Sequence, residues 1–175
     1  MEKTNSAIIE FLEEVYDGPK HPYTWFINNA PDSGLLGTIR SITAEEASTP
    51  VVEDGTTIAA HVGHLRWTLM KANSFIRGEN PSWDWSESWK VRRVDPEEWA
   101  SLIGSLEAEF KAVVQSLRSG ITWHSDEQLK EVLALIPHAS YHLGAIRQMA
   151  LMIRKEAGRR GRPSHTTETR KRRSP

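Results

Sequence analysis

Two closely spaced pairs of histidines are the side chains of this sequence best suited to chemistry. The first pair is His61 and His64, in the run His-Val-Gly-His, and the second is His138 and His142, in the run His-Ala-Ser-Tyr-His. On a helix, residues three or four positions apart have neighbouring side chains, with about 5–6 Å between their Cβ atoms. Two imidazoles at that spacing can bind one metal ion, each nitrogen lying about 2.0–2.1 Å from it. One pair by itself is not a complete site, so both segments would have to meet around the same ion.

The rest of the composition limits the metal ligands and catalytic groups that the chain can use. The chain of 175 residues contains no cysteine, which excludes disulfides, thiolate metal ligands and a cysteine nucleophile. A metal site therefore has to use histidine or carboxylate ligands. The sequence has no His-Glu-x-x-His motif of a metalloprotease, no Ser-His-Asp arrangement and no glycine-rich phosphate loop. The general base and the other catalytic residues are not identified by these patterns.

The elements that must position the histidines are amphipathic helices. The first is predicted from an apolar stripe that follows capping candidates at residues 4–6 and precedes the stop signal at residues 17–19. The second is predicted over residues 57–77, with one apolar stripe and a glycine after its end. Between them, residues 34–41 indicate a short helix and residues 43–46 match a capping box.

Two longer helices follow in the second half of the chain. The third is predicted to start after the cap residue Asp95, with a proline in its first turn, and to end at Gly120. The fourth is predicted to start near Ser125 and to carry a kink at Pro137. No segment alternates apolar and polar residues as a strand would. Four amphipathic helices without a sheet must bury their stripes against each other, which predicts an all-α fold, a four-helix bundle.

Helical phase places both histidine pairs at the edge of an apolar face. At about 100° per residue, His138 and His142 lie about 80–120° from the centre of their stripe, and His61 and His64 lie about 60° and 120° from theirs. Two packed helices could present such side chains to a shared groove. The alternative is that these are partly buried histidines satisfied by hydrogen bonds alone.

Both histidine segments resemble helices of the DinB superfamily, the DinB/YfiT-like metalloenzymes. Residues 57–67, followed by Asn73 and the run Arg77-Gly78-Glu79, look like the second helix of that family, and residues 138–149 look like its last helix. The resemblance implies an up-down-down-up bundle, and the connection of about 17 residues between the second and third helices could stretch to roughly 55 Å, which permits the required crossover.

The resemblance also implies a divalent metal ion held by three histidines. One ligand would come from the second helix and two from the His-x-x-x-His of the last helix, which carries over onto His138 and His142. The family's ligand on the second helix stands about seven residues after the small residue that opens it, here Thr57, which selects His64. His61 would then be a supporting group beside the ligands or a substitute ligand. Zinc, nickel and iron are not distinguished by such ligands.

A small-molecule enzyme is the function that the resemblance implies. Relatives suggest a metal-dependent thiol S-transferase or a hydrolase, with a low-molecular-weight thiol as one expected substrate, and they also suggest a homodimer. One alternative is a noncatalytic, metal-stabilised bundle that acts in a stress response or binds a partner. In another, which we favour least, the bundle is a dimerisation module that brings two basic tails to nucleic acid.

Charge and composition divide the chain into two parts. From Arg154 to the end there are nine Lys or Arg against two Glu. We therefore predict a bundle over residues 1–157 and a basic, disordered tail over residues 158–175. The N-terminus shows no secretory signal and no run is long enough to span a membrane, so we expect a cytoplasmic protein without a membrane partner.

A tryptophan-rich segment and several residues of the fourth helix could also contribute to the site or to packing. The tryptophan-rich segment 83–89 could cover the open end of the bundle and line an apolar pocket, but we expect it to pack on the outside of the core. Tyr141, Arg147 and Gln148 lie on or near the polar side of the fourth helix, where they could orient ligands or make surface contacts. Gly144 is predicted to allow close helix packing.

Overall fold

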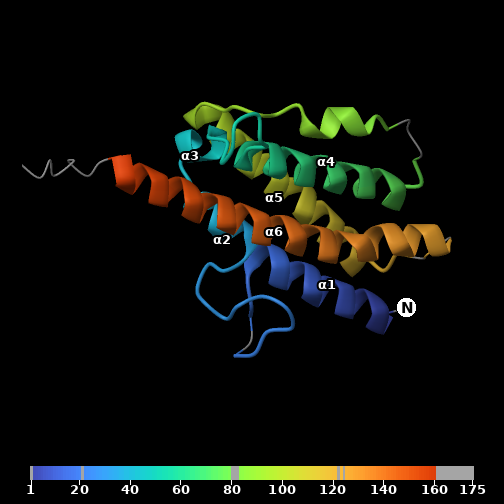
Figure 1. Cartoon of the computed structure of the whole chain (residues 1–175). Coiled ribbons are helices and arrows are strands. Elements are labelled where there is room, and N and C mark those ends of the chain that lie inside the picture. The colour runs from blue at the N-terminus through green and yellow to red at the C-terminus, as the bar shows by residue number, and fades with distance from the viewer. Residues whose placement is uncertain (1, 21, 80–82, 122, 124, 161–175) are drawn as a thin grey trace, which may run out of the picture.

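The computed structural model contains helices and no strands in the residues that it describes, which are 2–20, 22–79, 83–121, 123 and 125–160. Four long helices form the bundle, so the prediction of an all-α four-helix bundle is confirmed (Figure 1). None of the helices in this part of the chain has a stretch long and apolar enough to cross a bilayer. The elements in chain order are α1 (Glu2–Asp17), α2 (Leu35–Arg40), α3 (Ala44–Ser48), α4 (Ile58–Ile76), the 3-10 helix η1 (Trp85–Trp89), α5 (Pro96–Arg118) and α6 (Asp126–Arg160).

Local signals set most helix ends where the sequence predicts them. Thr57 caps α4, and its hydroxyl oxygen accepts a hydrogen bond from the backbone N–H of Ala60. Asp95 and Glu98 form a capping box at the start of α5, which has Pro96 in its first turn. Gly120 follows the end of α5 with φ of 84°, a left-handed conformation that favours glycine.

The start of α1 differs from its prediction. The helix begins at Glu2, so residues 4–6 lie inside it and do not cap it. Asn5 is buried there; its side-chain amide donates to the carbonyl of Leu117 (3.4 Å) and accepts from Nε1 of Trp123 (3.2 Å). The amide therefore joins α1 to the chain around the end of α5, and this tertiary contact takes the place of the predicted cap.

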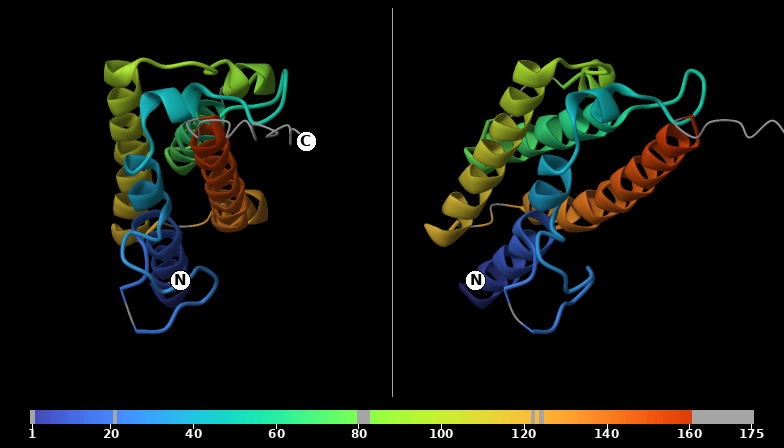
Figure 2. Two further views of the ribbon diagram at one scale, coloured as in Figure 1. Left: turned by 60° about the vertical axis from the view of Figure 1, so that its left-hand side comes forward. Right: turned by 90° about the vertical axis from the view of Figure 1, so that its left-hand side faces the viewer.

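The core lies where the four apolar stripes meet. α4 packs against both α5 and α6, and α1 packs against the same two helices. α2 and α3 lie between α5 and α6 and extend the layer that α1 begins (Figure 2). In the centre, the rings of Tyr16 and Phe110 stack with their centroids 4.5 Å apart, and burial raises the pKa of the Tyr16 hydroxyl.

The return of the chain from α4 to α5 matters for the site. α5 begins near the end of the bundle where α4 begins (Figure 1), and the hydroxyl of Thr57 donates to the carbonyl of Arg92 at 2.8 Å. The segment between the two helices therefore has to come back along α4. As a result η1 lies against α4.

α6 is a single long helix that includes Pro137 and ends at Arg160. It extends three residues into the segment predicted as a tail, residues 158–175, and residues 161–175 lie outside the described part of the chain. The prediction for Gly144 is wrong, because a Cβ atom built there would meet nothing within 4 Å.

Burial in the core predicts the effect of shortening its side chains. Leu106 on α5 is fully buried (0% exposed), whereas Leu151 on α6 is 61% exposed. We expect Leu106→Ala to lower the free energy of unfolding by about 2–5 kcal/mol because it leaves a cavity. The same truncation in Leu151→Ala should change it by less than about 0.5 kcal/mol. Urea denaturation of both variants checks this, and equal losses would contradict the core described here.

Candidate metal centre

Three imidazole nitrogens from two helices converge at one point. Nε2 of His138 lies 3.0 Å from Nε2 of His64 and 3.0 Å from Nε2 of His142. The three residues offer one nitrogen each within 4.8 Å of one another, in an arrangement that could hold a metal ion. The packing of α4 against α6 therefore brings together the three residues that the sequence selects.

These distances suit a cation better than a set of hydrogen bonds. A neutral imidazole nitrogen either donates through one N–H or accepts through one lone pair. Nε2 of His138 therefore cannot make good hydrogen bonds to both of its neighbours at once, although it is 3.0 Å from each. Two nitrogens each about 2.1 Å from a common ion lie about 3.0 Å apart at a right angle and about 3.4 Å apart at a tetrahedral angle. The three nitrogens thus fit one ion.

A serine holds the ring of His64 in the orientation that metal binding needs. Nδ1 of His64 lies 2.9 Å from Oγ of Ser88, and that hydroxyl donates its hydrogen to the carbonyl of Trp85 at 2.7 Å. Because the hydroxyl has one hydrogen, it accepts from the Nδ1–H of His64. We therefore assign the lone pair of this ring to Nε2, which faces the other two histidines.

His61 plays the corresponding part for His142. The Nδ1 atoms of the two rings are 2.7 Å apart. With the lone pair of His142 on Nε2, its Nδ1–H donates to Nδ1 of His61. His61 thus contacts the back of the cluster, through the nitrogen of His142 that faces away from the other rings.

Comparison with protein families agrees with this geometry. The family model described as the DinB superfamily matches residues 33–162. This range includes α2 to α6 and all four of these histidines, and it does not include α1. The chain belongs to the DinB superfamily. DinB-like proteins bind metal ions, and three histidines of this chain are close enough to hold one. Searches of curated proteins and of solved structures gave no match.

Burial keeps the imidazoles of this DinB-like site neutral. Desolvation, with smaller contributions from the charges of His138 and His61, lowers the pKa of His64 to about 4. Desolvation, together with its three histidine neighbours, lowers the pKa of His142 to about 3. Burial also lowers the pKa values of His61 and His138. Neutral rings have the lone pairs that a metal ion requires.

The tryptophan-rich segment lies over this cluster and, as expected, packs on the outside of the core, with Trp85 52% and Trp89 39% exposed. The ring of Trp89 stacks on His64 with a centroid distance of 4.2 Å and an interplanar angle of 14°. Ser88 is buried, and Trp85 contacts Trp67 of α4 with centroids 4.7 Å apart. Sequence reasoning considered the segment 83–89 as a possible pocket wall, but it did not foresee the contacts of Ser88 and Trp89 with His64. The tryptophan-rich composition was a signal for a pocket wall, but nothing in it indicated the role of the serine.

The three polar residues of α6 have different positions. Tyr141 is 72% exposed, and its ring meets His142 edge-on with centroids 5.1 Å apart. Arg147 donates to the backbone carbonyl of Ser33, so it ties α6 to the start of α2. Gln148 is exposed. Of the three, Tyr141 is the one in contact with the cluster.

The lowered pKa values predict how the stability of the metal-free protein changes with pH. The unfolded chain takes up protons on histidine near pH 6.5, whereas folded His64 and His142 do so near 4 and 3. The unfolded state therefore binds more protons below pH 6.5, and the free energy of unfolding should fall as the pH is lowered from about 6.5 toward 4.

Urea denaturation in the presence of a chelator between pH 7.5 and 4 measures this dependence. The double variant His64→Asn, His142→Asn should lose a large part of the fall between pH 6.5 and 5, while the other titrating groups keep their contribution. An unchanged pH profile in the double variant would show that these rings are not desolvated in solution.

Proposed function

We propose that this DinB-like protein is a metal-dependent enzyme that acts on a small molecule, as a thiol S-transferase or a hydrolase. His64, His138 and His142 would hold the divalent ion through their Nε2 atoms. The observation that carries the proposal is the convergence of these three nitrogens at 3.0 Å contacts, with the other nitrogens of His64 and His142 engaged by Ser88 and His61. Zinc, nickel and iron all accept such ligands.

Three neutral imidazoles suit a catalytic ion better than a closed structural site. An ion with these ligands keeps its full charge and open positions, and it would act as a Lewis acid toward an oxygen or sulfur donor of the substrate. The stacked ring of Trp89 covers one side of His64 and limits access of water there. Tyr141 borders His142 from the exposed side of α6, so a substrate could approach between these aromatic rings.

The surroundings of the cluster favour thiol transfer over hydrolysis. Within the described part of the chain, the three rings contact each other, His61, Ser88 and aromatic rings, and no carboxylate contacts them. Hydrolysis needs a group that accepts a proton from water. A thiol is far more acidic than water and needs less help to become a nucleophile. A low-molecular-weight thiol is therefore the substrate class that we favour.

A noncatalytic function is the second candidate. His64 and His142 are both nearly fully buried, and Trp89 stacks over the first of them. An ion held there could serve only to stabilise the bundle of a stress-response or partner-binding protein. In that case, metal would raise the stability of the protein without supporting the loss of any thiol.

Elemental analysis of protein purified without an affinity tag tests the ligand assignment. We expect about one divalent ion per chain in the wild type and nearly none in His142→Ala or His64→Ala, because two imidazoles bind an ion weakly. His61→Ala is the comparison; it keeps all three Nε2 atoms, so it should retain much more of the ion than either ligand variant, although it removes the acceptor of the His142 Nδ1–H. Metal retained at full stoichiometry in His142→Ala would overturn the assignment.

The same four proteins test the reaction. Loss of a small thiol in the presence of an electrophile, followed with a thiol reagent, should be seen with the metal-loaded wild type. The two ligand variants should show no more than the uncatalysed rate. A loaded protein that is stabilised by its metal but inactive toward thiols and hydrolysable esters would favour the noncatalytic candidate.

Ser88 provides a separate prediction about metal affinity. Ser88→Ala removes the acceptor of the His64 Nδ1–H, and we expect the metal dissociation constant to rise about 10–100-fold, as is usual when such a partner is lost. Ser88→Thr keeps the hydroxyl and should stay close to the wild type. Competition with a chelator measures the affinity, and nitrogen NMR of the His64 ring should show a tautomer change in the alanine variant alone. Equal affinities in the two variants would contradict this role.

A further inference from the structure

An open groove lies on the surface on the other side of α4 from the histidine cluster. Its volume is about 950 Å³, within the range of small-molecule sites, and none of the histidines lines it. Arg66 stands two residues after His64, which places it about 200° around the helix. The groove is bounded by α4, by the segment that follows η1 and by the first turns of α5. Its charged lining residues are Arg66, Lys90, Arg92, Arg93, Asp95, Glu97 and Glu98.

Two of the guanidinium groups in this groove have no anionic partner within the described part of the chain. Arg66 is half-buried, and its hydrogen bond is to the sulfur of Met70 at 3.1 Å, which is a weak acceptor. Arg93 makes no hydrogen bond or ion pair there. By contrast, Arg92 donates to the carbonyl of Gly55 at 2.7 Å.

Three acidic residues share the groove, Asp95, Glu97 and Glu98, and none of them forms an ion pair with Arg66 or Arg93 in the described part of the chain. Oδ1 of Asp95 accepts from the backbone N–H of Glu98 at 2.8 Å, and Oε2 of Glu98 accepts from the backbone N–H of Asp95 at 2.9 Å. Both carboxylates thus belong to the capping box of α5. Ser101 and Ser105 of the same helix add hydroxyl groups to the lining. The groove therefore combines two unpaired guanidinium groups, hydroxyl donors and an apolar wall, with the carboxylate of Glu97 exposed at its edge.

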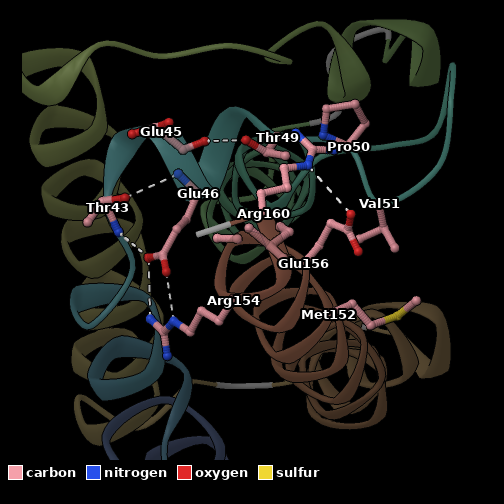
Figure 3. Close-up of a pocket in the computed structure, with 12 residues that line it drawn as sticks. Thr43, Glu45, Glu46, Thr49, Pro50, Val51, Met152, Arg154, Glu156 and Arg160 are labelled. Carbon is pink, nitrogen blue, oxygen red and sulfur yellow. Dashed lines mark hydrogen bonds and ion pairs between the residues drawn. The ribbon is translucent and has the colours of Figure 1, made fainter. Parts of the chain in front are cut away.

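The other large cavity provides a contrast. It has a volume of about 890 Å³ and lies between α3 and the C-terminal part of α6 (Figure 3). There Arg154 pairs with Glu46 at 2.7 Å and Arg160 approaches Glu156 at 3.5 Å. Its guanidinium groups already have carboxylate partners, so it lacks the feature that points to an anion.

We propose that the groove beside α4 and α5 binds a small anionic molecule through Arg66 and Arg93. A guanidinium group offers a planar pair of N–H donors that matches the oxygens of a carboxylate or a phosphate. Either anion supplies the partner that both groups lack. This site is separate from the three histidines, and its occupation does not depend on a bound metal or on the proposed enzymatic function.

Calorimetric titration of the metal-free, full-length protein tests the site with inorganic phosphate and with succinate as probes. We expect saturable binding of at least one of them, and the one that binds identifies the group that the groove prefers. Arg66→Gln and Arg93→Gln should each weaken binding by about tenfold, the usual effect of losing a charge-assisted hydrogen bond. Arg93 is exposed, so its variant tests the proposal even if the Arg66 variant is unstable.

Arg40→Gln is the matched control, because Arg40 is an exposed arginine of α2 that already pairs with Glu107 at 2.6 Å. It removes the same charge and should leave binding unchanged. Backbone NMR during the titration should show shifts at Ser101 and Ser105. Absence of saturable binding, an equal loss in Arg40→Gln, or shifts centred on His138 and His142 would each overturn the proposal.

Discussion

The packing of α4 against α6 is the constraint on which the site depends. It places Nε2 of His64 3.0 Å from Nε2 of His138, although the two residues are 74 positions apart in the chain. Two of the three rings are buried and His138 is partly buried, and its Nε2 cannot form good hydrogen bonds to both neighbours at once, so a cation among the three nitrogens would satisfy them all. The packing of the apolar stripes thereby also brings together three histidines that could hold a metal ion.

The return of the chain from α4 to α5 supplies the rest of the site. Because α5 begins close to the start of α4, the intervening segment has to run back along α4, and the bond between Thr57 and the carbonyl of Arg92 ties it down. η1 then lies over His64, where Ser88 orients the ring and Trp89 covers it. The residues that follow form a wall of the groove on the other side of α4. The segment between α4 and α5 thus contributes residues both to the histidine cluster and to the groove.

Local patterns predicted the helices well, and they failed where a side chain had a distant partner. The ends of α4 and α5 follow from Thr57, Asp95 and Gly120, whose effects involve only residues within a few positions. The capping candidates before α1 were wrong because Asn5 bonds to Leu117 on another helix. The tryptophan segment packs on the outside of the core as expected, but no local pattern predicted that Trp89 would stack on His64, because that contact depends on the path of the loop.

The sequence by itself determined the fold class and the four long helices. It also determined that two pairs of histidines lie on two of these helices. Each of these depends on periodicity and on contacts between neighbours along the chain. Only the tertiary structure decided that His64 joins His138 and His142 while His61 contacts the back of His142, and that Ser88 holds the first ring. These outcomes depend on the rotation of α4 relative to α6 and on the path of a loop, which side chains from the whole core set together.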